Sequence, residues 1–304
     1  EGAGYWGYTT MHLILFAEVL QRRLGIDDRR LINYPGTVRY ALSMTLPTRG
    51  RTAVNPHEGQ AYTATPKGAI EPAKGMVNFG DSGVAIDVSI APWVARTQGD
   101  GLASWVSQSV GGMAEWPAAI WFDERRPATP PGPELHDVRM ANDLVISRTG
   151  WNSDDSVVAL RSGGPANHEH ADRNSVIFAA HGERLWHDPF KAAYVPTSPR
   201  WLLRQTEAHT AVLIDGKGHQ YHDGHEGTNA SWAWARVRAF AKGDGWMTVT
   251  SDATEAYALV DPRVRLVERT LVFVKPDVLL VLDRVRLRNE PASVQMRFQV
   301  FNDD

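Results

Sequence analysis

Apolar side chains in the first part of the chain recur at spacings of three and four, the pattern of helices that bury one face. Similar spacing predicts helices over 8–24, 36–46, 84–97, 101–110 and 113–122. The first has five apolar residues on one predicted face: Leu13, Phe16, Ala17, Leu20 and Leu24. The stretch 47–83 has no strong period and contains Pro and Gly, so we expect a long functional loop there.

The pattern changes after a Pro-rich stretch at 127–133, which cannot continue a helix and predicts a semi-rigid connector. Short apolar and alternating runs then predict strands over 143–149, 156–161, 175–180, 211–214, 232–240, 246–250, 264–274, 278–285 and 294–301. Closely spaced strands of this kind favour an antiparallel β-sandwich. The fold class we expect is therefore an α+β multidomain protein, with helices followed by an antiparallel β-sandwich.

Alternating polar side chains stand just before one of these strands. His168, His170 and Asp172 occupy every second position, and the apolar run 176–180 follows. This alternation predicts a strand with all three side chains on one face. At about 3.3 Å of rise per residue the outer two would lie about 13 Å apart, too far for one metal ion with bonds of about 2 Å. Any metal here must take most of its ligands from elsewhere.

Composition narrows the choice of function. The chain has 304 residues, 43% of them hydrophobic, and a net charge of −3, so a broad basic surface for nucleic acid is not expected. The absence of cysteine excludes disulfides and thiolate metal sites. No apolar run reaches about 18 residues, so we expect no membrane span. The eleven tryptophans could pack the core or form platforms for sugar rings.

Histidines cluster in the predicted sandwich, where eight of the eleven lie between His168 and His225. Asp188 and His209 stand at the edges of apolar strand runs, where they could converge with a histidine. Two imidazoles and a carboxylate suit Zn²⁺ with an open fourth position. Two alternatives are a hydrogen-bonded His–Asp network without metal and a chance cluster of surface histidines.

Three linked motifs resemble the heparinase II/III-like family of polysaccharide lyases. They are the run 167–172, the His187-Asp188-Pro189 element, and Ala208-His209 leading into 212–218. The opening residues 1–8 and the loop 78–81 resemble the helical half of that family. The resemblance covers nearly the whole chain.

This resemblance implies a partial (α/α) toroid over 1–126, a Pro-rich linker over 127–137 and a β-sandwich over 138–304, with an acidic polysaccharide bound between the halves. It implies that His170, Asp188 and His209 hold a structural zinc, that His168 faces the substrate and that Asp172 supports the site without binding metal. It also implies a periplasmic or secreted protein.

The implied reaction removes the C5 proton of a uronic acid and expels the 4-linked oxygen. A tyrosine can serve as general base, general acid or both, and Tyr5 or Tyr8 resembles the catalytic tyrosine. Tyr194, Arg200 and Arg204 are the candidate substrate-binding residues, since hydrogen-bond donors must neutralise the uronate carboxylate. The residues alone, without the resemblance, favour ordinary helix-start packing beside Trp6 as the role of the two tyrosines.

Two departures from the family pattern limit these expectations. Thr210 stands where the family commonly has Asn, and the family's helix before the catalytic tyrosine has no counterpart, because nothing precedes Glu1. We therefore expect a piece of a longer protein, weakly active or inactive alone. Other readings are a non-catalytic carbohydrate-binding protein that keeps the fold and zinc, and a zinc hydrolase.

Overall fold

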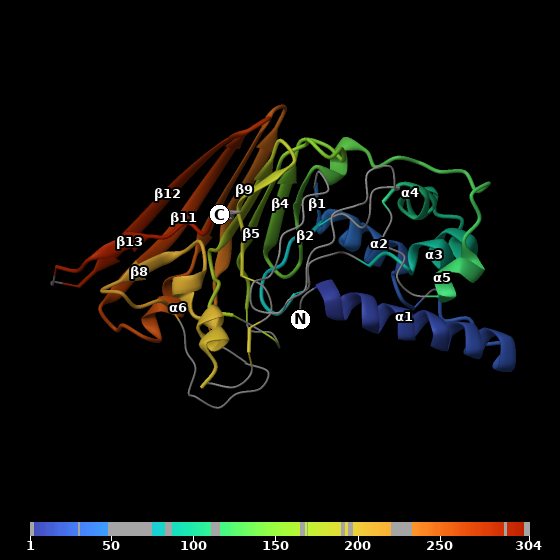
Figure 1. Ribbon diagram of the computed structural model, residues 1–304, viewed down its shortest axis with the longest axis horizontal. Coiled ribbons are helices and arrows are strands. Elements are labelled where there is room, and N and C mark those ends of the chain that lie inside the picture. The colour runs from blue at the N-terminus through green and yellow to red at the C-terminus, as the bar shows by residue number, and fades with distance from the viewer. Residues whose placement is uncertain are drawn as a thin grey trace.

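The computed structural model describes residues 3–29, 31–47, 75–82, 87–110, 116–164, 168, 170–189, 192–193, 197–219, 233–288 and 291–300. Helices come first along the chain and strands follow (Figure 1). The first part contains α1 (Ala3–Val19), a π-helical turn η1 (Leu20–Leu24), α2 (Tyr34–Ser43), α3 (Ala91–Gln98), α4 (Gly101–Ser109) and α5 (Pro117–Trp121). Among the described helices, none combines the length and apolar character needed to cross a bilayer.

Helix α1 begins earlier than expected and buries only part of the predicted face. Met11, Ile14 and, from the predicted face, Ala17 are buried, whereas Leu13 and Phe16 of that face are 36% and 59% exposed. Most of the predicted face was wrong because α1 carries apolar residues all round, so that spacing alone does not select one side.

Local capping explains where helices α2 and α4 begin. Asn33 accepts a hydrogen bond from the Gly36 N–H at the start of α2, and Asp100 accepts one from Ala103 at the start of α4. Helix α3 begins at Ala91 instead of residue 84, and α5 is shorter than the predicted 113–122; residues 83–86 and 111–115 lie outside the described chain.

Two short strands interrupt the predicted helix 36–46 and the predicted loop 47–83. Strand β1 (Thr45–Leu46) pairs antiparallel with β2 (Gly75–Met76). Residues 48–74, most of the predicted loop, lie outside the described part. The described segment 75–82 is therefore attached to the end of α2, and this places its polar end beside the sandwich.

Antiparallel sheets make up the second part. After η2 (Pro133–Leu135), one five-stranded sheet runs in sequence order through β3 (Asp137–Arg139), β4 (Leu144–Arg148), β5 (Val157–Arg161), β6 (Val176–Ala180) and β7 (Glu183–Trp186). A four-stranded sheet contains β9 (Arg236–Gly243), β10 (Trp246–Asp252), β11 (Val264–Val274) and β12 (Val278–Leu287). The remaining elements are η3 (Pro199–Arg204), η4 (Thr206–Ala208), β8 (Val212–Ile214), α6 (Thr254–Ala258) and β13 (Val294–Met296), and β8 pairs with β13. Strands β3 and β7 were not predicted.

The five-stranded sheet is the middle layer of the molecule (Figure 1). Along β5, Val157 and Ala159 belong to the core shared with the helices, while Val158 and Leu160 belong to the core shared with the four-stranded sheet. Alternate residues point to opposite faces of a strand, so both faces of this sheet are covered. That explains why β4, β5 and β6 are buried at every position.

Arg148, at the end of β4, ties the middle sheet to the helical part. Its Nη2 donates to the carbonyl of Thr45 at 3.0 Å and to that of Ser43, and its guanidinium lies 4.1 Å from the ring centre of Trp151. Burial lowers the pKa of Arg148 to about 9. Backbone oxygens and one aromatic ring therefore solvate this cation in place of water.

Replacing Arg148 by Met should lower the free energy of unfolding by about 3 kcal/mol, because two buried carbonyls lose their donor. Urea unfolding followed by circular dichroism measures this loss. The matched control is Arg139→Met, since Arg139 is 42% exposed and pairs with Asp143 at 2.7 Å. That exposed pair should contribute less than about 1 kcal/mol. Equal midpoints for the two variants would contradict the role of Arg148.

Candidate functional site

The predicted strand over His168, His170 and Asp172 is not present, and that prediction is corrected here. His168 has a left-handed backbone (φ 58°), and so has Asn174 (φ 65°). The Ser175 N–H donates to the carbonyl of Asp172 at 2.9 Å and closes a turn directly before β6. The alternating sequence pattern therefore arises from a turn whose buried polar groups face different partners, and the strand spacing does not apply.

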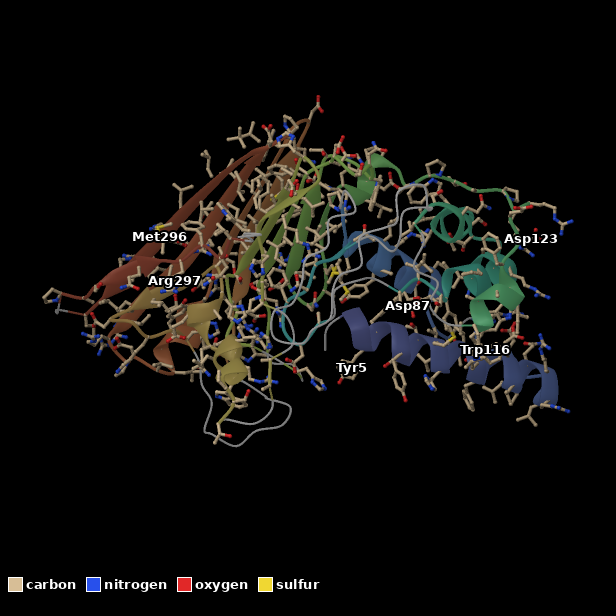
Figure 2. The ribbon with its side chains drawn as sticks, viewed as in Figure 1. Tyr5, Asp87, Trp116, Asp123, Met296 and Arg297 are labelled. Carbon is tan, nitrogen blue, oxygen red and sulfur yellow. The ribbon has the colours of Figure 1, made fainter. Side chains whose placement is uncertain are left out.

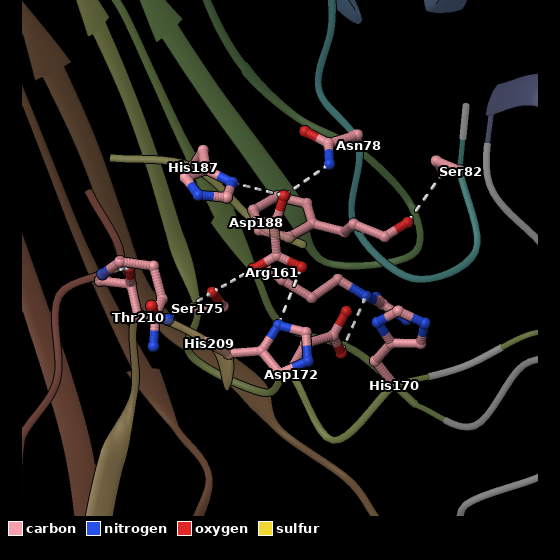
Figure 3. A network of polar contacts seen from close by, with 12 residues as sticks. Asn78, Ser82, Arg161, His170, Asp172, Ser175, His187, Asp188, His209 and Thr210 are labelled. Atoms are coloured by element: carbon pink, nitrogen blue, oxygen red, sulfur yellow. Dashed lines mark hydrogen bonds and ion pairs between the residues drawn. The ribbon is translucent and has the colours of Figure 1, made fainter. Parts of the chain in front are cut away.

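His170, Asp188 and His209 nevertheless converge. All three are buried, and one ligand atom from each lies within 4.8 Å of the others. His170 precedes β6, Asp188 follows β7 and His209 precedes β8. Three segments next to strand ends therefore contribute one side chain each (Figure 3). Among the described residues this is the group of histidine, aspartate or glutamate side chains close enough to hold one metal ion.

Hydrogen bonds hold the Asp188 carboxylate in place (Figure 3). Its Oδ1 accepts from the Ser175 hydroxyl at 2.6 Å, and its Oδ2 lies 2.9 Å from His209 Nδ1. Burial lowers the pKa of His209, but the charge and hydrogen bond of Asp188 outweigh burial, so that this pKa is raised overall. In the described structure, His170 Nδ1 and His209 Nε2 are buried and have no hydrogen-bond partner.

The loop 78–81 holds this cluster from the helical side. Asn78 donates to the Asp188 carbonyl at 2.8 Å, and the Asp81 N–H donates to the His168 carbonyl at 3.1 Å. Gly80 has φ 67°, and a Cβ there would lie 2.8 Å from the His168 oxygen, so a larger residue would separate the two segments. A backbone contact between the two parts therefore needs glycine.

Tyr5 of α1 contacts His168, whereas Tyr8 contacts His12. The Tyr5 and His168 rings are stacked, with centres 4.4 Å apart and planes at 23°. Figure 2 labels Tyr5 at the end of α1 that points toward the sandwich. Tyr8 is 66% exposed and packs on His12 at 4.2 Å. Of the two candidate tyrosines, Tyr5 is the one next to His168.

The other predicted residues are distributed differently. The Arg204 side chain is only 1% exposed, and its Nη2 lies 3.0 Å from Asp81 Oδ2. Arg200 belongs to η3, but its side chain and all of Tyr194 lie outside the described part. The Arg204 guanidinium therefore pairs with the carboxylate of Asp81, which belongs to the helical part.

Asp172 and Thr210 have structural partners beside the cluster. Asp172 Oδ1 lies 3.1 Å from Arg173 Nη1 and 3.9 Å from Arg161 Nε. Thr210 donates its N–H to the Ser175 hydroxyl, and its own hydroxyl accepts from the Gln299 N–H. Both residues connect segments that carry the cluster.

Arg269 is a buried site residue that sequence reasoning missed. It comes from β11, in the four-stranded sheet, and donates from Nη1 to the carbonyls of Asn174 and Thr210. Its Nε and Nη2 pair with the two oxygens of Asp283 at 2.8 and 2.7 Å. Asn174 and Thr210 flank the segments of two cluster members, so the outer sheet supports the cluster. An arginine in an alternating strand gives no sequence signal for this role.

The sequence of this chain matches a known protein family. The sequence model of one family, described as heparinase II/III-like, C-terminal, matches residues 131–303, more than half of the chain. The chain belongs to the heparinase II/III-like family. The resemblance inferred from the motifs is thereby confirmed. No curated protein matches the chain significantly.

Two solved heparinase III structures share the fold of this chain. A heparinase III structure aligns over 87% of this chain with TM-score 0.58 and 11% identity, and a second heparinase III over 77% with TM-score 0.56 and 14% identity. A heparan sulfate lyase, HepC from Pedobacter heparinus, aligns over 71% with TM-score 0.47 and 18% identity. The aligned parts make up 35%, 33% and 30% of those three chains, so this heparinase II/III-like chain spans about a third of their length.

Replacing Arg269 by Met should lower the free energy of unfolding by about 3 kcal/mol or more, because Asp283 and two carbonyls would stay buried without their donor. Arg284→Met is the control on the neighbouring strand, since Arg284 is 63% exposed and pairs with Glu268 at 2.9 Å. The control should change stability by less than about 1 kcal/mol in urea unfolding. A similar small change in both variants would show that Arg269 does not support the cluster.

Proposed function

We propose that this chain is part of a polysaccharide lyase that cleaves a uronic-acid-containing acidic polysaccharide by β-elimination. In this proposal residues 1–126 are the end of an (α/α) toroid, 127–137 the linker and 138–304 the sandwich, and the protein acts in the periplasm or outside the cell. Membership of the heparinase II/III-like family supports the reaction class. The observation that carries the proposal is the stacking of Tyr5 on His168 beside the metal-capable cluster.

Tyr5 is the proposed acid and base, and His168 the proposed partner at the substrate. A tyrosine hydroxyl could remove the C5 proton and return one to the departing 4-oxygen. Charge that develops next to the uronate carboxylate needs donors around it. Arg200 and Tyr194 remain candidate substrate-binding residues, whereas we assign the buried Arg204 to support of Asp81.

We propose that His170, Asp188 and His209 hold Zn²⁺. Two imidazoles and one carboxylate are donors that zinc accepts, and their spacing fits a single ion. His170 Nδ1 and His209 Nε2 are buried and have no hydrogen-bond partner in the described structure, which favours a cation at this cluster. When bound, zinc would cross-link three segments of the sandwich, a structural contribution.

The test of the reaction is the ultraviolet absorbance of the unsaturated uronate, with the full-length gene product and with alginate, heparan sulfate and hyaluronan as substrates. At least one polymer should give a signal. Tyr5→Phe should lower kcat by about 100- to 10,000-fold, because the proton-transfer group is lost. Tyr8→Phe is the matched control and should keep the rate within a few-fold, since Tyr8 is exposed and packs on His12.

Three outcomes would overturn parts of this proposal. No signal on any uronate polymer, combined with retained binding, would favour a non-catalytic carbohydrate-binding protein. Full activity of Tyr5→Phe would remove Tyr5 from the mechanism. Hydrolysis products without unsaturated ends, lost on chelation, would indicate a zinc hydrolase.

Replacing His170 by Ala should remove zinc and lower Tm together, because metal binding and folding are coupled. Metal analysis after gel filtration, with thermal unfolding of the same samples, measures both. His181→Ala is the control, since His181 is 69% exposed and pairs with Asp277 at 3.1 Å. This control should keep the zinc content and Tm of the unmodified protein. Unchanged zinc in His170→Ala would exclude His170 as a ligand.

A further inference from the structure

Asp81, a residue of the helical part, gathers donors from the sandwich around one buried carboxylate. Its side chain is 1% exposed. Oδ1 lies 2.9 Å from His170 Nε2 and accepts from the Ala192 N–H at 3.3 Å. Oδ2 lies 3.0 Å from Arg204 Nη2 and 3.3 Å from His168 Nδ1. Each carboxylate oxygen therefore faces a different histidine.

Asp81 is not itself close enough to join the proposed metal ligands. The group whose ligand atoms lie within 4.8 Å of one another contains His170, Asp188 and His209. Asp81 reaches that group through Nε2 of the His170 ring. Its influence on a bound cation would thus pass through His170.

The contacts set the tautomers of both rings. A carboxylate accepts hydrogen bonds, and a neutral imidazole has one N–H donor and one acceptor nitrogen. The nitrogens that face Asp81 must then be the donors, Nε2–H in His170 and Nδ1–H in His168. The lone pairs are left on His170 Nδ1 and on His168 Nε2. His170 Nδ1 is the buried atom that has no hydrogen-bond partner in the described structure.

We propose that Asp81 is a positioning residue that fixes opposite tautomers in two histidines, one for metal and one for substrate. This inference rests on the proposed function of His168 and His170. It makes the His168 nitrogen that faces Asp81 the donor, and so fixes the orientation of the ring that stacks on Tyr5.

Arg204 and the left-handed backbone of His168 serve the same arrangement. Arg204 Nη2 supplies a positive charge 3.0 Å from Asp81 Oδ2, and Arg204 Nε donates to the Ala193 carbonyl at 3.0 Å. The His168 φ of 58° lies in a region that costs about 1 kcal/mol or more for a residue with a Cβ. The Asp81 contacts, from both its side chain and its N–H, help to hold that conformation.

The direct test is long-range ¹H–¹⁵N correlation spectroscopy of the zinc-loaded chain labelled with ¹⁵N-histidine. His168→Gln and His170→Gln identify the two rings through the loss of their signals. The expected spectrum has His168 as the Nδ1–H tautomer and His170 as the Nε2–H tautomer. The opposite tautomer at either ring in the unmodified protein would overturn the proposal.

Asp81→Asn is the decisive variant, because an amide keeps the shape but replaces one acceptor oxygen by a donor. At least one of the two rings should lose its tautomer, and zinc affinity, measured by competition with a chromophoric chelator, should fall about 10- to 100-fold. Retention of both tautomers and of full zinc affinity would refute the role of Asp81. If Asp81→Asn does not fold, the tautomers of the unmodified chain decide the question alone.

The control is Asp137→Asn, which changes another buried, ion-paired carboxylate. Asp137 pairs with Lys275 at 2.8 Å and lies in β3, away from the two histidines. This variant should lower stability but leave both tautomers and zinc affinity unchanged. If Asp137→Asn and Asp81→Asn lose tautomers and zinc affinity to the same extent, the effect of Asp81 is general destabilisation and the proposal is refuted. Both readouts are taken without substrate, so absence of lyase activity would sink the proposed function and leave this result standing.

Discussion

The burial of both faces of the five-stranded sheet is the constraint on which the rest of the structure depends. Val157 and Ala159 face the helices, and Val158 and Leu160 face the second sheet. A sheet that is apolar on both sides needs both covers, because uncovering either face would return its side chains to water. Backbone and charged groups at the ends of the middle strands are then buried as well, and they must find partners inside the protein.

Arginines meet that requirement at several points. Arg148 and Arg204 reach across to the helical part, Arg269 crosses from the second sheet, and Arg173 donates to the carbonyls of Gly164 and Ala233. Burying a guanidinium costs desolvation free energy that offsets much of the attraction to its partners, so these contacts contribute little net stability. Their planar, directional donors instead fix how segments meet. The cluster of His170, Asp188 and His209 lies where these segments come together.

Part of this arrangement could be predicted from the sequence. Helices before antiparallel strands follow from apolar spacing, and the long strand 264–274 has the predicted bounds. The face of α1 was not predictable, since its apolar residues surround the helix. The turn at 168–175 was mistaken for a strand because alternating polar residues also occur where left-handed residues change direction. The convergence of His170, Asp188 and His209 was predicted from the family motifs, and the binding of zinc by these residues stays a prediction. Asp81 has no local pattern and is visible only in three dimensions.

The separation of two residues along the chain sets the entropic cost of bringing them together. Asp188 and His209 are 21 residues apart, whereas Asp81 and His168 are 87 residues apart. Closing the longer loop costs roughly 1 kcal/mol more in chain entropy. The three members of the metal-capable cluster can therefore meet while the sandwich forms, but the two histidine rings acquire their shared carboxylate only when the helices dock. In chain entropy, bringing Asp188 and His209 together within the sandwich therefore costs less than adding Asp81 from the helical part.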